Sequence, residues 1–271
     1  MMPFELLTTS FMSNSKKPAF AGRRRGVYFL PNLFTTASLF AGFYAIVAAM
    51  HQQFNMAGIA IFVALIFDGL DGRVARLINA QSAFGAEYDS LSDMVSFGVA
   101  PALVLYNWVL HYLGVYGLDK IAWLAAFMYA ACVALRLAKF NVQAELSSPI
   151  SKRYFFGLPC PPSAAFVASM VWLGNRYDLA GPHLAIIMVF VTVALALLMV
   201  SNILFRSFKD IDMKHNVGFP VMVLVLLVII VIALWPPFAL FVIAGVYVCS
   251  GPIFAGLRWV GKARKRAKRR A

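Results

Sequence analysis

Charged side chains are scarce in this chain. Asp, Glu, Lys and Arg together make up 13% of its 271 residues, whereas they make up about 25% of a typical soluble domain. Hydrophobic residues account for 62% of the chain, and its mean hydropathy is +0.78. This balance argues against a soluble fold with an oversized core and in favour of an integral membrane protein.

Cysteine and histidine are also few. The 3 cysteines, Cys132, Cys160 and Cys249, are scattered without the short spacings of metal-binding thiolates. The 4 histidines are isolated from one another, and no Ser, His and Asp form a readable catalytic arrangement. We therefore expect no structural disulfide, no cysteine-based metal site and no catalytic triad.

The apolar residues gather in runs of roughly 18 to 25, the length that crosses a bilayer core of about 30 Å. These runs predict an all-α, polytopic membrane protein, a bundle of about eight transmembrane helices joined by short connections. The expected spans are 32–51, 56–78, 90–114, 121–140, 158–174, 182–205, 217–234 and 238–257.

Lys and Arg outnumber Asp and Glu by 24 to 11, so the formal net charge is +13. With a cytoplasmic amino terminus, eight spans place all the basic residues except Lys120 and Arg176 at the cytoplasmic face, as the positive-inside rule requires. Both termini are then cytoplasmic, in a protein of the cytoplasmic (inner) membrane. The basic residues after the last span suit anionic lipid headgroups better than nucleic acid.

Four aspartates stand close together near two predicted helix ends. Asp68 and Asp71 are three residues apart, and Asp89 and Asp93 are four apart, so each pair shares one helix face. Consecutive helices joined by a short turn run antiparallel, which brings the two pairs together. Each carboxylate at membrane depth costs about 2.5–3.5 kcal/mol, less near the interface. Bound Mg²⁺ or Mn²⁺ would offset that cost and the mutual repulsion.

Other residues beside the aspartates fit a phosphate ligand. Glycines at positions 69, 72 and 85 keep the helix surfaces low, and Arg76 offers a guanidinium that binds phosphate oxygens well. The alternative interpretation is structural: the acids would lie at the membrane interface, neutralised by Arg73 and Arg76.

The pattern Asp68-x2-Asp71-Gly72-x2-Ala75-Arg76-x8-Gly85-x3-Asp89-x3-Asp93 resembles, without a departure, the signature of the CDP-alcohol phosphotransferases. Members of this family move a phosphatidyl or similar group from a CDP-linked lipid to an alcohol. The resemblance implies a six-helix core and a homodimer. It divides the chain into a basic cytoplasmic arm, the family's membrane core, two additional transmembrane helices and a basic cytoplasmic tail. These four segments are residues 1–30, 31–205, 206–257 and 258–271.

The resemblance also implies roles for individual residues. Two metal ions are expected, bound by Asp68, Asp71, Asp89 and Asp93, and Asp93 also acts as the general base. The residues expected to contact CDP-diacylglycerol are Asn32, Thr35, Asp68, Gly72, Ala75, Arg76 and Ser82.

Two further segments, 136–141 and 155–165, resemble the branch of the family whose acceptor is L-serine, although Lys139 stands where arginine is commoner. The serine carboxylate needs a cationic partner, and the candidates for serine contacts are Arg136, Lys139, Asn141 and Arg153. These basic residues could instead be ordinary cations at the membrane boundary. Choline, inositol or glycerol phosphate are alternative acceptors. A cation transporter with intramembrane acids is an alternative from another class of protein.

Overall fold

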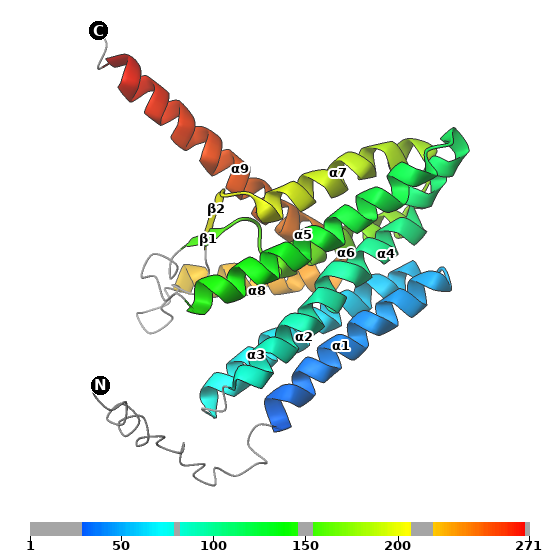
Figure 1. Ribbon diagram of the computed structural model, residues 1–271, viewed down its shortest axis with the longest axis horizontal. Helices are drawn as coiled ribbons and strands as arrows, with labels where there is room; N and C mark the ends of the chain where they lie inside the picture. Colours follow the sequence, from blue (N-terminus) through cyan, green and yellow to red (C-terminus); the bar gives the residue numbers. More distant parts are fainter. Residues whose placement is uncertain (1–28, 79–81, 146–153, 207–218, 269–271) are drawn as a thin grey trace, which may run out of the picture.

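The computed structural model describes residues 29–78, 82–145, 154–206 and 219–268 (Figure 1). Helices and one small sheet make up these residues. The helices are α1 Phe29–Met50, α2 Phe54–Leu77, α3 Ala83–Asp93, the π-helix η1 Met94–Val99, α4 Ala100–Trp108, the 3-10 helix η2 Leu110–Tyr116, α5 Asp119–Glu145, α6 Cys160–Arg176, α7 Pro182–Val200, α8 Phe219–Leu234 and α9 Pro236–Lys268. The strands are β1 Tyr154–Phe156 and β2 Leu204–Arg206.

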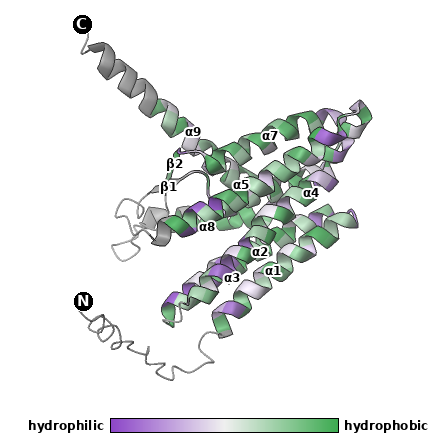
Figure 2. Cartoon of the chain, in the orientation of Figure 1, coloured by the Kyte–Doolittle hydropathy of each residue, from purple (hydrophilic) through white to green (hydrophobic). Residues whose placement is uncertain are grey.

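The prediction of a polytopic helical membrane protein is confirmed. Five helices are long and apolar enough to cross a membrane, namely α1, α2, α5, α7 and α9. The bent stretch from Ala83 to Tyr116 makes a sixth. Apolar residues cover most of each helix, and hydrophilic residues concentrate on α3 and toward the helix ends (Figure 2). The count of eight stays a prediction, because α6 and α8 have 17 and 16 residues, fewer than the roughly 20 of a full crossing.

Helices α1 and α2 form an antiparallel pair that small residues hold close together. Ala45, Ala48, Ala57 and Ala64 are buried between helices. In lipid, helix association relies on close van der Waals packing, which small side chains permit. The pair therefore brings the start of α1 next to the end of α2, where the first two aspartates lie.

Hydroxyl groups then tie α1 to its neighbours. Ser38 on α1 donates to the Ala64 carbonyl at 3.0 Å, and Ser92 on α3 donates to the Thr35 carbonyl at 3.1 Å. Ser96 donates to the Ser38 carbonyl at 3.0 Å. A Cβ placed on Gly42 would lie only 2.6 Å from the Ser96 Oγ, so only glycine lets the two helices approach this closely.

The third predicted span, 90–114, is wrong as a single regular helix. The segment is helical from Ala83, widens into η1 directly after Asp93, and bends by 43° before η2. Pro101, near the start of α4, explains the widening. Its nitrogen has no proton to donate, and its ring crowds the carbonyl four residues earlier. Single π-turns of this kind are frequent at functional sites.

The predicted span 182–205 is also wrong at its carboxyl end. Helix α7 stops at Val200, and β2 pairs antiparallel with β1, so that Phe155 lies opposite Phe205. Gly157 follows β1 with φ of 80°, and a Cβ there would clash with the Met199 carbonyl oxygen. This two-stranded ribbon was not predicted, because its strands pair across about fifty residues of sequence.

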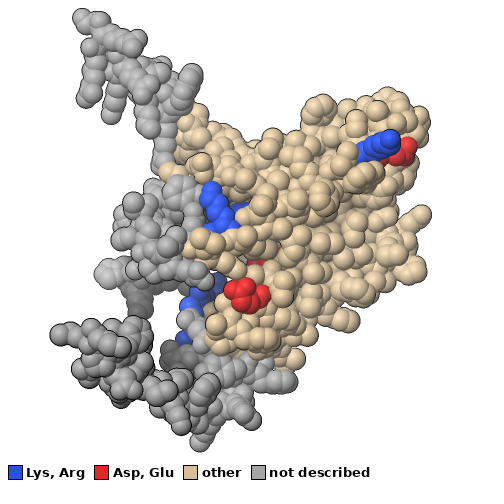
Figure 3. Space-filling view, in the orientation of Figure 1, with Lys and Arg blue, Asp and Glu red and all other residues tan. Residues whose placement is uncertain are grey.

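The two ends of the bundle carry the polar groups. Asn175 at the end of α6 donates to Asn55 at the start of α2, at 3.0 Å. The aspartates lie at the other end of α2. On the face in Figure 3, the described charged side chains gather toward opposite ends and leave the surface between them uncharged. This distribution is typical of a membrane protein with two water-facing sides.

Candidate active site

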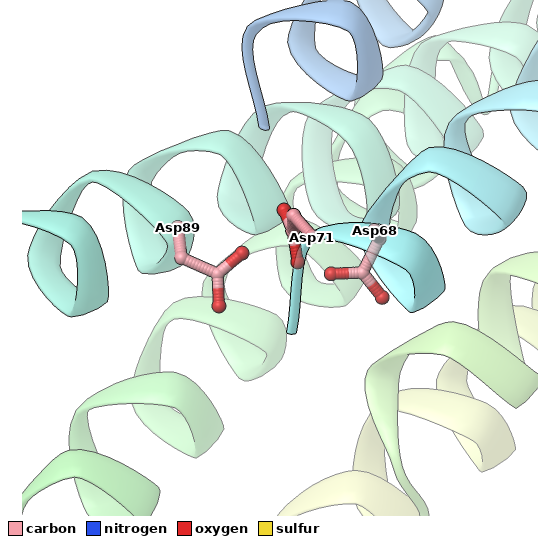
Figure 4. A group of neighbouring side chains, drawn as sticks. All are labelled: Asp68, Asp71 and Asp89. Atoms are coloured by element: carbon pink, nitrogen blue, oxygen red, sulfur yellow. The ribbon is translucent and has the colours of Figure 1, made fainter. Parts of the chain in front are cut away.

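Three aspartates meet between α2 and α3 (Figure 4). Asp68 and Asp71 come from the last turns of α2, and Asp89 comes from α3. Each offers a carboxylate oxygen, and these oxygens lie within 4.8 Å of one another. Asp71 is buried, with 5% of its surface exposed. The predicted convergence of the two helices is therefore what the structure shows for these three residues.

Asp93, the fourth predicted ligand, lies outside that group of three but interacts directly with Asp68. Within the described residues, the Oδ1 atoms of Asp89 and Asp93 are buried and accept no hydrogen bond. Buried carboxylate oxygens without a partner are costly unless a cation binds them. An all-carboxylate group is also the hard oxygen donor set that divalent cations prefer. The residues present therefore fit a metal ion.

The alternative interpretation, neutralisation of the acids by Arg73 and Arg76, is not supported. The interactions that the structure shows at Asp68, Asp89 and Asp93 are with the other aspartates, and Asp71 bonds with Thr35 and Asp89. Both arginines are exposed on α2. Arg76 stands in the last turn of that helix, at the same end as the aspartates.

Thr35 connects α1 to the aspartates. Its hydroxyl donates to Oδ2 of Asp71 at 2.8 Å and lies 3.2 Å from the Pro31 carbonyl oxygen. The side chain is buried, with 3% of its surface exposed. The sequence predicted that Thr35 contacts the lipid donor. In the structure its hydroxyl orients a carboxylate of the cluster, and the contact of Thr35 with the lipid donor stays a prediction.

The glycines behave differently from one another. Cβ atoms built on Gly69 and Gly72 would meet nothing within 4 Å, so the surface of α2 is open there, as predicted. A Cβ on Gly85 would lie 3.1 Å from the Ser82 Oγ and 3.4 Å from the Asn32 Oδ1. The surface is therefore less open at Gly85 than expected, because Ser82, the residue that begins the same helix, and Asn32 of α1 already lie next to it.

Ser82 begins α3. Its Oγ accepts a hydrogen bond from the Gly85 N–H at 3.0 Å, which makes it the N-cap. Ser, Thr, Asp and Asn are the common N-cap residues because their side-chain oxygens satisfy a free N–H of the first turn. The structure thus brings Asn32, Ser82 and Gly85 together beside the aspartates. Ala75, on α2, is partly buried.

Arg136 is one of the residues predicted to contact the acceptor serine, and the part of the site around it is called the acceptor side below. Arg136 lies on α5 with 9% of its surface exposed, and its Nη1 is 3.9 Å from the Cys160 Sγ on α6. Its Nε is buried and has no hydrogen-bond partner among the described residues. Cys160 interacts electrostatically with both Arg136 and Asp93. Arg136 therefore lies at the same end of the bundle as the aspartates.

The other predicted serine contacts have protein partners or fall outside the description. Lys139 Nζ donates to Asn202 Oδ1 at 3.2 Å, and Asn141 Nδ2 donates to Ser90 Oγ at 3.0 Å. Asn141 therefore joins α5 to α3. Arg153 lies outside the described residues. Sequence reasoning missed Asn202, since no motif marks a residue that contacts Lys139 from a position 63 residues away.

Comparison with known proteins finds a matching family and several relatives that share one name. Residues 28–200 match the sequence profile described as CDP-alcohol phosphatidyltransferase. A Helicobacter pylori (strain J99) protein is 39% identical over 234 residues, which cover 86% of this chain and 92% of the relative. A Mycobacterium bovis protein is 34% identical over 246 residues, covering 88% and 83%. A Bacillus subtilis protein is 34% identical over 182 residues, covering 67% and 92%. All three carry the name CDP-diacylglycerol–serine O-phosphatidyltransferase.

Proposed function

We propose that this chain, which belongs to the CDP-alcohol phosphatidyltransferase family, transfers the phosphatidyl group of CDP-diacylglycerol to the hydroxyl of L-serine. The products are phosphatidylserine and CMP. One observation carries the proposal: a cluster of carboxylates, of which Asp71 is buried and the others are partly buried, lies at the same end of the bundle as the buried cation Arg136. The names of the three relatives support serine as the acceptor.

The residues that would hold the metal are Asp68, Asp71 and Asp89, together with Asp93. Carboxylates without thiolate or imidazole partners suit Mg²⁺ or Mn²⁺, and we propose that two ions bind. Bound there, they would neutralise the pyrophosphate and stabilise the negative charge on the leaving CMP.

The protein's own part in the reaction begins with Asp93. As the serine hydroxyl attacks the β-phosphorus of CDP-diacylglycerol, a new O–P bond forms and the P–O bond to CMP breaks. The Asp93 carboxylate accepts the hydroxyl proton, because it stands beside Asp68 and has a buried oxygen with no hydrogen-bond partner among the described residues. Asp93 would also bind one of the metal ions, and the other three aspartates would act as ligands alone.

The donor lipid would lie along the open face of α2. Gly72 leaves room for a phosphate near the backbone, and exposed Arg76 can bind phosphate oxygens. We propose that Asn32, Ala75 and Ser82 line this face together with the carboxylate of Asp68. Thr35 acts through Asp71, since its hydroxyl is already bound there.

The serine carboxylate would pair with Arg136. A guanidinium in a mostly apolar setting keeps its charge and offers several donors in a fixed plane, which matches a carboxylate. Lys139 already donates a hydrogen bond to Asn202, and Asn141 donates one to Ser90. We therefore assign those two residues to shaping the acceptor side of the site. We also propose Arg153 as a second cation that contacts the serine.

The location follows from the charge distribution of the sequence. We propose that the chain resides in the cytoplasmic (inner) membrane, with the aspartates and both termini on the cytoplasmic side. We also retain the division into an arm (1–30), a core (31–205), two additional helices (206–257) and a tail (258–271). A homodimer is proposed from the family resemblance.

A direct assay of the purified chain tests the proposal. CDP-diacylglycerol is supplied in detergent micelles with Mn²⁺ and, in separate reactions, with serine, choline, inositol or glycerol 3-phosphate. The expected lipid product, identified by mass spectrometry, is phosphatidylserine, formed with an equal amount of CMP. A product from another alcohol but not from serine would correct the acceptor. No lipid product with any alcohol would contradict the proposal.

A further inference from the structure

Two contacts place Arg136 opposite the segment that carries the proposed base. A Cβ on Gly98 of η1 would lie 3.1 Å from Cγ1 of Val133 on α5, so the two residues pack directly on each other. Further along α5, Asn141 donates to the Ser90 Oγ of α3 at 3.0 Å. Arg136 lies between these two contacts on α5, one turn after Val133 and therefore on the same helix face. The proposed base lies between the same two contacts on the other segment, which runs antiparallel to α5.

The guanidinium of Arg136 touches protein through one nitrogen and leaves another unpaired among the described residues. Nη1 donates to the Cys160 Sγ, at 3.9 Å. Nε, which shares the opposite edge of the guanidinium with Nη2, is buried and has no hydrogen-bond partner within the described segments. A buried N–H without a partner costs free energy, and two parallel N–H groups on one edge of an arginine bind both oxygens of a carboxylate. This edge therefore suits the carboxylate of an amino acid, a group that choline and inositol lack.

The chain around Cys160 holds its sulfur in a fixed place. Leu158, two residues before it, is fully buried and donates its N–H to the Leu198 carbonyl at 3.0 Å. After Cys160, two prolines stand in the first turn of α6, where their rings fix the backbone φ. Cys160 itself is buried, with 1% of its surface exposed. The sulfur is therefore the rigid member of the contact, and it decides the orientation of the long side chain of Arg136.

We propose that Cys160 is a positioning residue for the acceptor: its sulfur holds Nη1 of Arg136 and thereby keeps the Nε–Nη2 edge turned toward the carboxylate of the acceptor amino acid. This inference rests on the proposed function and deepens it, because it names the group that orients the carboxylate-binding cation. It also gives a role to a cysteine for which the sequence predicted none. Selection of an amino acid as the acceptor then depends on two side chains from different helices, α5 and α6.

The test replaces Cys160 in the full-length protein. Cys160→Ala removes the sulfur, and the KM for serine is expected to rise about 3- to 10-fold, as for the loss of one polar interaction. The KM for CDP-diacylglycerol and kcat at saturating serine are expected to change less than about twofold, because the change weakens only the binding of the acceptor. Cys132→Ala is the matched control and should leave all three values unchanged. It also removes a buried cysteine sulfur, on α5, but one without a hydrogen bond among the described residues.

Cys160→Ser separates positioning from packing. Its hydroxyl keeps an acceptor for Nη1, so the KM for serine should be closer to that of the wild type in Cys160→Ser than in Cys160→Ala. If the sulfur only fills apolar space, Cys160→Ser should be the more impaired variant, since it buries a polar group.

An unchanged KM for serine in Cys160→Ala, with an active wild type, overturns this inference and leaves the proposed function standing. A Cys160→Ser variant as impaired as Cys160→Ala, or equal losses for both substrates, would show a purely structural role and also overturn it. A wild type inactive with serine would reject the proposed function itself.

Discussion

The hydroxyl of Thr35 on α1 donates a 2.8 Å hydrogen bond to Oδ2 of Asp71 on α2, and both side chains are buried. This bond is the polar contact through which the first helix fixes a carboxylate of the candidate metal cluster. Ser92 strengthens the same junction, because its hydroxyl donates to the Thr35 carbonyl at 3.1 Å. Three helices therefore meet at one threonine, next to the place where the carboxylates of α2 and α3 converge.

Removal of that hydroxyl should weaken metal binding. Thr35→Val keeps the size of the side chain but leaves Asp71 without its donor. Loss of an outer-shell partner of this kind typically costs 10- to 100-fold in metal affinity or activity. We expect the Mn²⁺ concentration at half-maximal activity to rise by roughly that factor. Thr192→Val is the control, since the buried Thr192 hydroxyl donates only to Met188 of its own helix. Equal Mn²⁺ dependence of Thr35→Val and the wild type would show that the bond does not support the cluster.

The cluster itself should be essential for metal binding. Asp68→Asn and Asp89→Asn each remove one of the three converging carboxylates, and the loss of activity should exceed the roughly 100-fold typical of outer-shell changes. Excess chelator should likewise stop turnover. Mn²⁺ binding, measured by electron paramagnetic resonance, should fall in both variants and persist in Asp178→Asn, a change at an exposed aspartate beyond α6. Full turnover in excess chelator would reject the metal site.

Close packing of α1 against η1 should be sensitive to one methyl group. A Cβ on Gly42 would lie 2.6–2.9 Å from atoms of Ser96, including its backbone Cα, so the helices must separate. Gly42→Ala is expected to destabilise the protein by about 1–3 kcal/mol and to lower its thermal midpoint in detergent. Gly256→Ala on α9, where a Cβ meets nothing within 4 Å, should be neutral. A Gly42→Ala variant as stable as wild type would contradict the packing described.

Orientation in the membrane is tested with single cysteines on a background in which Cys132, Cys160 and Cys249 are replaced. Tyr177→Cys, beyond the end of α6, should react with an impermeant thiol reagent from the outer face of intact cells. Val142→Cys, near the end of α5, should react only after the cells are opened. Both parent side chains are exposed. The reverse pattern would place the aspartates on the outer side.

The spacing of the aspartates was enough to predict most of the aspartate cluster. Helical periodicity alone puts Asp68 beside Asp71, and a short turn between antiparallel helices adds Asp89. The N-cap role of Ser82 also had a local signal, since a serine before a helical segment is a common helix start. The N-cap role of Ser82 was not predicted, because the same serine matches a position that contacts the nucleotide lipid in the family.

The remaining features depend on contacts between distant segments. The pairing of Phe155 with Phe205 and the hydrogen bond from Lys139 to Asn202 join residues far apart in the sequence. No local pattern reports such contacts. The widening of the helix after Asp93 had a possible signal in Pro101, but a proline can equally kink or end a helix. The sequence therefore predicted that the aspartates converge better than it predicted how α5, α6 and the β-ribbon are held together.

The most direct test of the account compares wild-type protein with Asp93→Asn, because Asp93 is assigned as the base in direct transfer to serine. Phosphatidylserine formation should fall about 10²- to 10⁴-fold, while binding of labelled CDP-diacylglycerol remains close to that of the wild type. The wild type should not exchange labelled CMP into CDP-diacylglycerol when serine and phosphatidylserine are absent. Substantial transfer to serine by Asp93→Asn, or rapid serine-independent exchange by the wild type, would contradict direct attack assisted by Asp93.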